Sequence, residues 1–258
     1  MKDKTSPQNL KVKDRLEVFR DEEFVFNEAA HRYYYRDREL TSVTKYISRF
    51  HKKFDEDYWA KKRSKKTGVP VEDILLEWKS GAKISTDLGT SVHKWIENYY
   101  NNIYQELPQD IEVVRRINKF NLFWAKHLKN FDPVVFELKV FSSKLGLAGT
   151  IDSIFIKGDI PLIIDWKSNK KFTTDEDGEK CWEKLLPPFQ DWCKNHLNEY
   201  SIQISLYRLI LEEVGIVIPS GYLVHLGPEE GEAKIHKCHD YLPVLREHFY
   251  GKADDLFG

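Results

Sequence analysis

Three short apolar segments in the middle of the chain constrain the fold more than any other feature. They read VVFELKVF over 134–141, LAGTIDSIFI over 147–156 and PLIIDWKS over 161–168, and only a few residues separate each from the next. Spacers this short allow antiparallel hairpins but are too short for the crossover connection that parallel strands need. The sequence therefore predicts a three-stranded antiparallel meander.

Segments of helical periodicity surround the meander. Apolar residues recur at helical spacing over 71–80, 84–104, 110–130 and about 201–214. Further strands are predicted in a hairpin over 24–35 and in GYLVHL (221–226), and Thr41-Ser42 is a cap for a helix that follows it. This order predicts an α/β fold with a mixed central β-sheet flanked by helices, plus a helical N-terminal lobe.

We expect one domain over 1–258, with three parts. Residues 1–22 are polar and predicted to be loose, 23–130 form a helical and basic lobe, and 131–225 form the core. Residues 172–199 are predicted to be a long irregular insertion, either a lid or a packed loop.

Composition and charge restrict the class of protein. The formal net charge is -1, which excludes a protein that binds nucleic acid through overall positive charge alone. No apolar run is long enough to span a membrane, the first residues lack the apolar segment expected of a secretory signal, and three cysteines cannot all pair. We therefore expect a soluble cytoplasmic protein with reduced cysteines and no membrane partner.

The basic residues are nevertheless concentrated near the N-terminus. Their density peaks at Lys61, Lys62 and Arg63, close to the aromatic Tyr58 and Trp59. A solvated helix end explains such a run, and so does a surface that follows phosphates while its rings stack on bases.

Turn geometry brings three carboxylates into one row. A two-residue turn at Gly158 places Asp152 opposite Asp165, and a four-residue loop between the first two strands places Glu137 opposite Asp152. Cross-strand neighbours lie about 5 Å apart, where like charges cost up to about 1 kcal/mol. A positively charged group is therefore expected among these carboxylates.

Two positive groups are candidates. Lys167 lies two residues after Asp165 and so shares its strand face, while a divalent cation such as Mg²⁺ prefers carboxylate oxygens. The alternative is that these residues have no function beyond structure and form an exposed polar face with a carboxylate–lysine network.

Two helical segments could complete such a site. His93 follows Gly89 by one helical turn, and its imidazole is either a ligand for Mn²⁺ or Mg²⁺ or a structural residue. Gln203 and Tyr207 are also one turn apart, and this polar pair either contacts phosphate or base groups or simply belongs to the polar side of the helix.

Four of these motifs together resemble a known family. GTSVH (89–93), AGTID (148–152), IIDWKSNKK (163–171) and QISLY (203–207) occur in the order typical of the PD-(D/E)XK nuclease superfamily. They are most similar to its RecB-like and phage exonuclease group, which has a His motif and a Q-x-x-x-Y motif. The resemblance implies a restriction-endonuclease-like core.

The same resemblance implies roles for individual residues. Asp152, Asp165 and Lys167 would be catalytic. The implied metal ligands are His93, Asp152, Asp165, the carbonyl of Trp166 and, less uniformly in the family, Glu137. The implied DNA contacts are Gln203 and Tyr207, to which we add the basic residues Lys170, Lys171, Lys61, Lys62 and Arg63.

The implied activity is a DNA exonuclease that depends on Mg²⁺ or Mn²⁺. It would act on single-stranded DNA or DNA ends in phage-type recombination, replication or repair, in the host cytoplasm if phage-encoded. A structure-specific endonuclease with the same metal site and a catalytically silent DNA-binding subunit are the alternatives. Some relatives hold an iron–sulfur cluster on four cysteines, and because this chain has 3 we expect no cluster.

Overall fold

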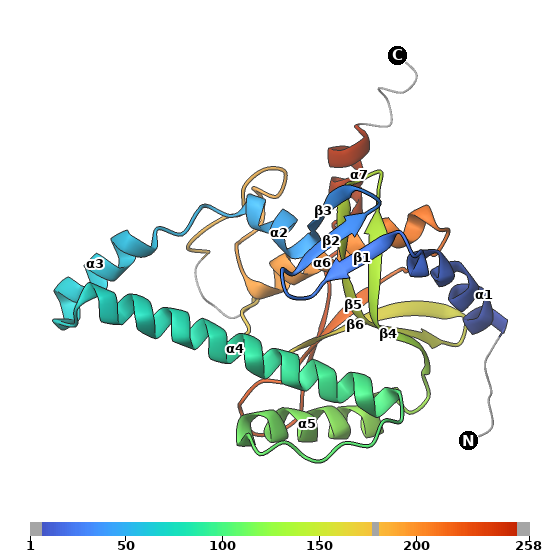
Figure 1. Ribbon diagram of the computed structural model, residues 1–258, viewed down its shortest axis with the longest axis horizontal. Helices are drawn as coiled ribbons and strands as arrows, with labels where there is room; N and C mark the ends of the chain where they lie inside the picture. The colour runs from blue at the N-terminus through green and yellow to red at the C-terminus, as the bar shows by residue number, and fades with distance from the viewer. Residues whose placement is uncertain (1–6, 177–180, 252–258) are drawn as a thin grey trace.

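The computed structural model describes residues 7–176 and 181–251 and has the predicted α/β architecture (Figure 1). Among the described residues, eight strands form one mixed sheet in the order β1-β2-β3-β5-β6-β7-β8, with β4 paired to β5. The strands are β1 Phe24–Asn27, β2 Arg32–Tyr35, β3 Arg38–Ser42, β4 Asp132–Ser142, β5 Leu147–Lys157, β6 Ile160–Lys167, β7 Gly221–His225 and β8 Lys234–Lys237.

Helices cover both faces of this sheet. They are α1 Pro7–Leu16, α2 Val43–Ile47, α3 Glu56–Thr67, α4 Val71–Tyr100, α5 Ile111–Phe123, α6 His196–Glu213 and α7 Leu242–Tyr250, with short helical turns at Glu17–Arg20, Ser48–Phe50 and Trp124–Leu128. One core packs α1, α2, α6 and α7 against the sheet, and a second core packs α5 and the C-terminal half of α4 against the opposite face. No described helix is long and apolar enough to cross a membrane.

The predicted registers of the meander are confirmed. Leu138 pairs with Ile151 across β4 and β5, and Ser153 pairs with Ile164 across β5 and β6. The row of carboxylates, however, coincides with a gap in the β4–β5 ladder and with the end of the β5–β6 ladder. Glu137 has a φ of 47°, in the left-handed region that side chains rarely adopt, and the β4–β5 pairing skips Glu137 and Asp152. The strand backbone is therefore bent at the point where these acidic side chains project.

Three predictions about the N-terminal part are wrong. Residues 7–20 are not loose, because α1 and the turn after it bury Val12, Leu16 and Phe19 in the core; residues 1–6 lie outside the described range. Residues 24–42 do not belong to a helical lobe, since β3 joins the central sheet beside β5. The two helices predicted over 71–80 and 84–104 form one helix, α4. Gly81 lies between them, and a glycine inside a helix costs only about 1 kcal/mol, which is too little to end it.

The predicted insertion is largely a packed loop. Leu185 and Phe189 are buried in the core, although residues 177–180 of this segment lie outside the described range. Cys181 and Cys193 form a disulfide here, so the expectation that all cysteines are reduced is wrong. Cys238 is free.

Candidate metal centre and substrate cleft

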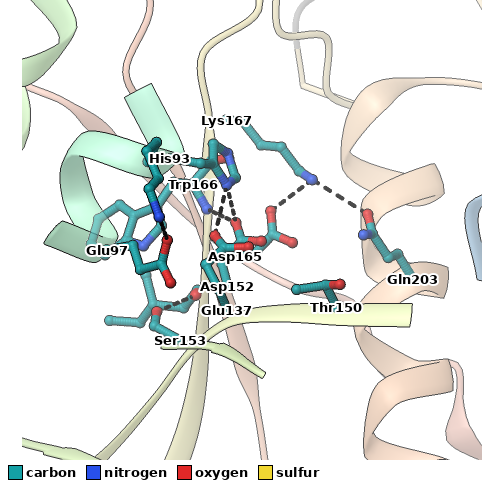
Figure 2. Close-up of polar contacts among 12 residues, drawn as sticks. His93, Glu97, Glu137, Thr150, Asp152, Ser153, Asp165, Trp166, Lys167 and Gln203 are labelled. Carbon is teal, nitrogen blue, oxygen red and sulfur yellow. Dashed lines mark hydrogen bonds and ion pairs between the residues drawn. The ribbon is translucent and has the colours of Figure 1, made fainter. Parts of the chain in front are cut away.

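Residues from five elements meet at the bend in the sheet (Figure 2). His93 comes from α4, Glu137 from β4, Asp152 from β5, Asp165 and Lys167 from β6, and Gln203 from α6. The sequence places Asp165 and Lys167 two residues apart on one strand, but the approach of His93 and Gln203 depends on how α4 and α6 pack on opposite faces of the sheet.

His93, Glu137 and Asp152 form a compact group of possible metal ligands. His93 Nδ1 lies 3.3 Å from Glu137 Oε1 and 3.6 Å from Asp152 Oδ2, and one ligand atom from each of the three residues fits within 4.8 Å. His93 Nε2 donates a hydrogen bond to the carbonyl of Trp166 at 2.9 Å. This bond orients the ring so that Nδ1 faces the carboxylates, as the partner of a ligating imidazole does.

Asp152 also ties β5 to β6. Its Oδ2 accepts a hydrogen bond from the backbone N–H of Trp166 at 2.8 Å, beyond the last paired residues of these strands. The carbonyl of Trp166, which the resemblance implies as a metal ligand, accepts the bond from His93 described above. A ligand role for Trp166 stays a prediction.

Asp165 and Lys167 form the second half of the site. Lys167 Nζ lies 2.7 Å from Asp165 Oδ2 and donates a hydrogen bond to Gln203 Oε1 at 3.3 Å. The side chain of Asp165 is 1% exposed, and its Oδ1 has no hydrogen-bond partner among the described residues. A buried carboxylate oxygen without a partner is costly, and a hard cation is a group that would satisfy it.

The charges of this cluster shift its pKa values. Burial and, after it, the neighbouring charge of Asp152 together raise the pKa of Asp165 to about 6. Burial alone lowers the pKa of His93, but the charges of Asp152 and Glu137 outweigh it and raise the pKa to about 9. Burial also raises the pKa of Asp152. The site thus carries more negative charge than its own positively charged residues neutralise.

Gly149 and Tyr207 show why the AGTID motif has a glycine. A Cβ atom on Gly149 would lie 2.7 Å from Tyr207 Cε1, a distance that real side chains do not reach. Tyr207 is 2% exposed, and its hydroxyl accepts a hydrogen bond from Gln203 Nε2 at 3.2 Å. Tyr207 therefore orients Gln203, which in turn contacts Lys167. Direct DNA contacts by Gln203 and Tyr207 stay predictions.

Sequence reasoning missed two residues that hold the end of β6. The centre of the Tyr200 ring lies 4.0 Å from Lys167 Nζ. Tyr200 precedes Gln203 on α6 by three residues, and this helical spacing could have identified it. Arg116 of α5 is fully buried and donates a hydrogen bond from Nε to the carbonyl of Ser168 at 2.9 Å. No sequence pattern signals that long-range contact.

A cleft of about 670 Å³ opens beside the cluster. Glu137, Gln203 and Tyr207 belong to its lining, so the cleft leads directly to the site. Sequence reasoning also missed Glu97, another residue of the lining, although it lies one helical turn after His93.

The basic residues predicted to bind DNA lie outside this cluster. Lys61, Lys62 and Arg63 are on α3, which projects from the body of the molecule together with the first half of α4 (Figure 1). Arg63 forms an ion pair with Glu77 at 2.9 Å, so part of the basic run has a structural partner.

Lys170 and Lys171 follow β6 closely, three and four residues after Lys167. They are outside the group of candidate metal ligands, and a role for either in DNA binding stays a prediction.

Comparisons with known proteins add little to this geometry. No model of a protein family matches the chain, and no curated protein matches its sequence. Among solved structures, the chain is similar to one titled "Crystal structure of SSO0001", with 9% sequence identity, a TM-score of 0.26, and coverage of 63% of this chain and 69% of that chain. A similarity at this level carries no argument about fold family or function.

Proposed function

We propose that this protein is a divalent-metal-dependent DNA exonuclease of the PD-(D/E)XK superfamily. One observation carries the proposal: a buried Asp165 with an unpartnered oxygen lies beside Lys167, next to the ligand group of His93, Glu137 and Asp152. Carboxylate oxygens with one imidazole suit Mg²⁺ or Mn²⁺, and their excess negative charge favours binding of a cation.

The residues of the site have distinct tasks in this proposal. A divalent cation, when bound, would lower the pKa of a water molecule and stabilise charge on the phosphate. Asp152 and Asp165 would hold the cation, together with His93 and Glu137. Burial alone lowers the pKa of Lys167, but the charges of Asp165 and Asp152 outweigh it and raise the pKa. Lys167 therefore stays protonated and would offset charge on the phosphate and orient the attacking water.

The cleft and the projecting helices would bind the substrate. Gln203, which contacts Lys167, would hold the strand near the bond that is cut. On α3, the Lys62 ammonium lies 4.7 Å from the centre of the Trp59 ring, an arrangement in which a cation and a ring are both available to a single strand. Lys61 lies next to them on the same exposed helix.

Cleavage of labelled DNA tests this function. End-labelled linear single- and double-stranded DNA would be incubated with Mg²⁺, Mn²⁺ or EDTA, beside circular single-stranded DNA. Metal-dependent loss of the linear substrates with an intact circle supports an exonuclease, and cutting of the circle supports an endonuclease with the same site. Retention of DNA without cutting in either metal contradicts nuclease activity and supports a silent DNA-binding subunit.

A further inference from the structure

The cleft beside the cluster has two chemically different walls. One wall comes from the β1–β2 hairpin and carries aromatic rings, among them Phe26 and His31. The part of the lining that comes from α4 is polar and charged: it carries Thr90, Lys94 and Glu97, and Lys94 Nζ lies 2.9 Å from Glu97 Oε2. A ligand that fits both walls has a flat apolar part on one side and a polar or anionic part on the other.

The aromatic wall is held rigidly against the sheet. The rings of Phe26 and Tyr33 stack with centroids 4.5 Å apart, and the His31 ring meets Phe26 edge-on at 5.3 Å. Tyr33 is buried, and its hydroxyl lies 3.2 Å from Thr150 Oγ1 on β5. This contact ties the hairpin to β5 two residues before Asp152.

The rings remain accessible from the cleft. Phe26 is half-buried and His31 is exposed, although both lie in a hairpin that packs on the core. Lys139 Nζ lies over the Phe26 ring, 5.5 Å from its centre, so a cation already contacts this ring. A ring next to a lysine is a typical surface for one nucleotide, because the base stacks while the ammonium meets its phosphate.

We propose that Phe26 and His31 bind an unpaired nucleobase of the substrate, next to the phosphate held at the metal centre. This inference rests on the proposed nuclease function and adds to it that the strand is unpaired at this position. A base must expose a face to stack on these rings, whereas both faces of a base within a duplex are covered by its neighbours. The sugar–phosphate backbone then faces Thr90 and Lys94 on α4.

The test measures binding and base stacking without cleavage. Single-stranded oligonucleotides with 2-aminopurine at successive positions would be titrated with protein in Ca²⁺ instead of Mg²⁺. Phe26→Leu keeps apolar volume but removes the ring, and His31→Asn removes the ring while tolerating the left-handed φ of 48° at this position. Val25→Ala is the matched control, because Val25 is an exposed neighbour of Phe26 on the opposite face of β1.

We expect about a tenfold loss of affinity in Phe26→Leu and a smaller loss in His31→Asn, with Val25→Ala unchanged. The change of 2-aminopurine fluorescence at one position should disappear in both ring variants. An abasic nucleotide at that position should weaken binding to the wild type but add no further loss in Phe26→Leu. Binding and fluorescence of both ring variants equal to those of Val25→Ala would overturn the inference.

The two proposals can fail separately. If the wild type cuts DNA in Mg²⁺ but the ring variants bind like the control, only the base site is wrong. If the wild type never cuts but shows the ring-dependent fluorescence change, the base site is supported and the nuclease function is contradicted. Thermal unfolding of each variant shows that it is folded before it is titrated.

Discussion

Asp165 and Lys167 form a 2.7 Å ion pair on one face of β6, with side chains only 1% and 15% exposed. A buried ion pair of this kind is weak evidence for stability, because removing two charges from water costs about as much as their attraction returns. Asp165 can also accept a further interaction, since its Oδ1 has no hydrogen-bond partner among the described residues. Both facts favour a functional role for the pair.

Removing either member of this pair should abolish the proposed activity. We expect Asp165→Asn and Lys167→Met each to slow metal-dependent DNA cleavage by about 100-fold or more, because each removes charge from the site of the reaction. The rate of release of end label from linear DNA measures the effect. Asp159→Asn, which changes an exposed carboxylate in the adjoining turn, is the control and should cut at the parent rate. Parent rates in folded Asp165→Asn would refute the assignment.

Divalent cations should stabilise the folded protein through the same carboxylates. A ligand that binds only the folded state raises the free energy of unfolding, so Mn²⁺ or Mg²⁺ in excess over EDTA should raise the Tm of the wild type. Asp152→Asn, which neutralises a member of the ligand group, should show a smaller rise. Equal rises in both proteins would show that cations bind elsewhere.

The metal-free protein should lose stability as the pH rises. Burial alone lowers the pKa of His93, but Asp152 and Glu137 raise it from 6.5 to about 9. Because the folded state binds this proton more tightly, its stabilising contribution is complete below pH 6.5 and disappears as the pH rises through 9. Unfolding in EDTA at pH 6 and pH 9.5 measures the change. His93→Gln should show a smaller pH dependence, and parallel curves for the two proteins would contradict the assignment.

Two glycines should respond in opposite directions to alanine. Gly149→Ala forces a Cβ against the ring of Tyr207 and should lower the free energy of unfolding by about 1–3 kcal/mol. Gly81→Ala lies in α4 with open space around the added Cβ and should raise it by about 1 kcal/mol. Urea unfolding measures both. A neutral Gly149→Ala variant would show that Tyr207 moves aside without cost.

Tyr200 should position Lys167 through its ring. A cation over an aromatic ring in a desolvated site is stabilised by about 2 kcal/mol. We expect Tyr200→Phe to keep kcat within about twofold and Tyr200→Leu to lower kcat by about tenfold, because only the second removes the ring. KM for DNA should change little in either variant. Equal kcat values in both variants would indicate that the ring of Tyr200 only fills space.

The sequence alone determined the meander and the alignment of its carboxylates. Side chains alternate along a strand and turn length sets the register, so neighbouring residues were sufficient to predict that Leu138 faces Ile151 and that Ser153 faces Ile164. Lys167 on the face of Asp165 follows from the same period. These features depend on residues close together in the chain.

Tertiary structure alone decided which distant side chains complete the site. His93 reaches Glu137 because the C-terminal half of α4 packs on β5 and β6. The left-handed φ of Glu137 is also a feature that no local pattern of the sequence indicated. Such contacts depend on how helices and hairpins pack on a common core. The free energy of that packing comes from many residues, so no local pattern of the sequence predicts it.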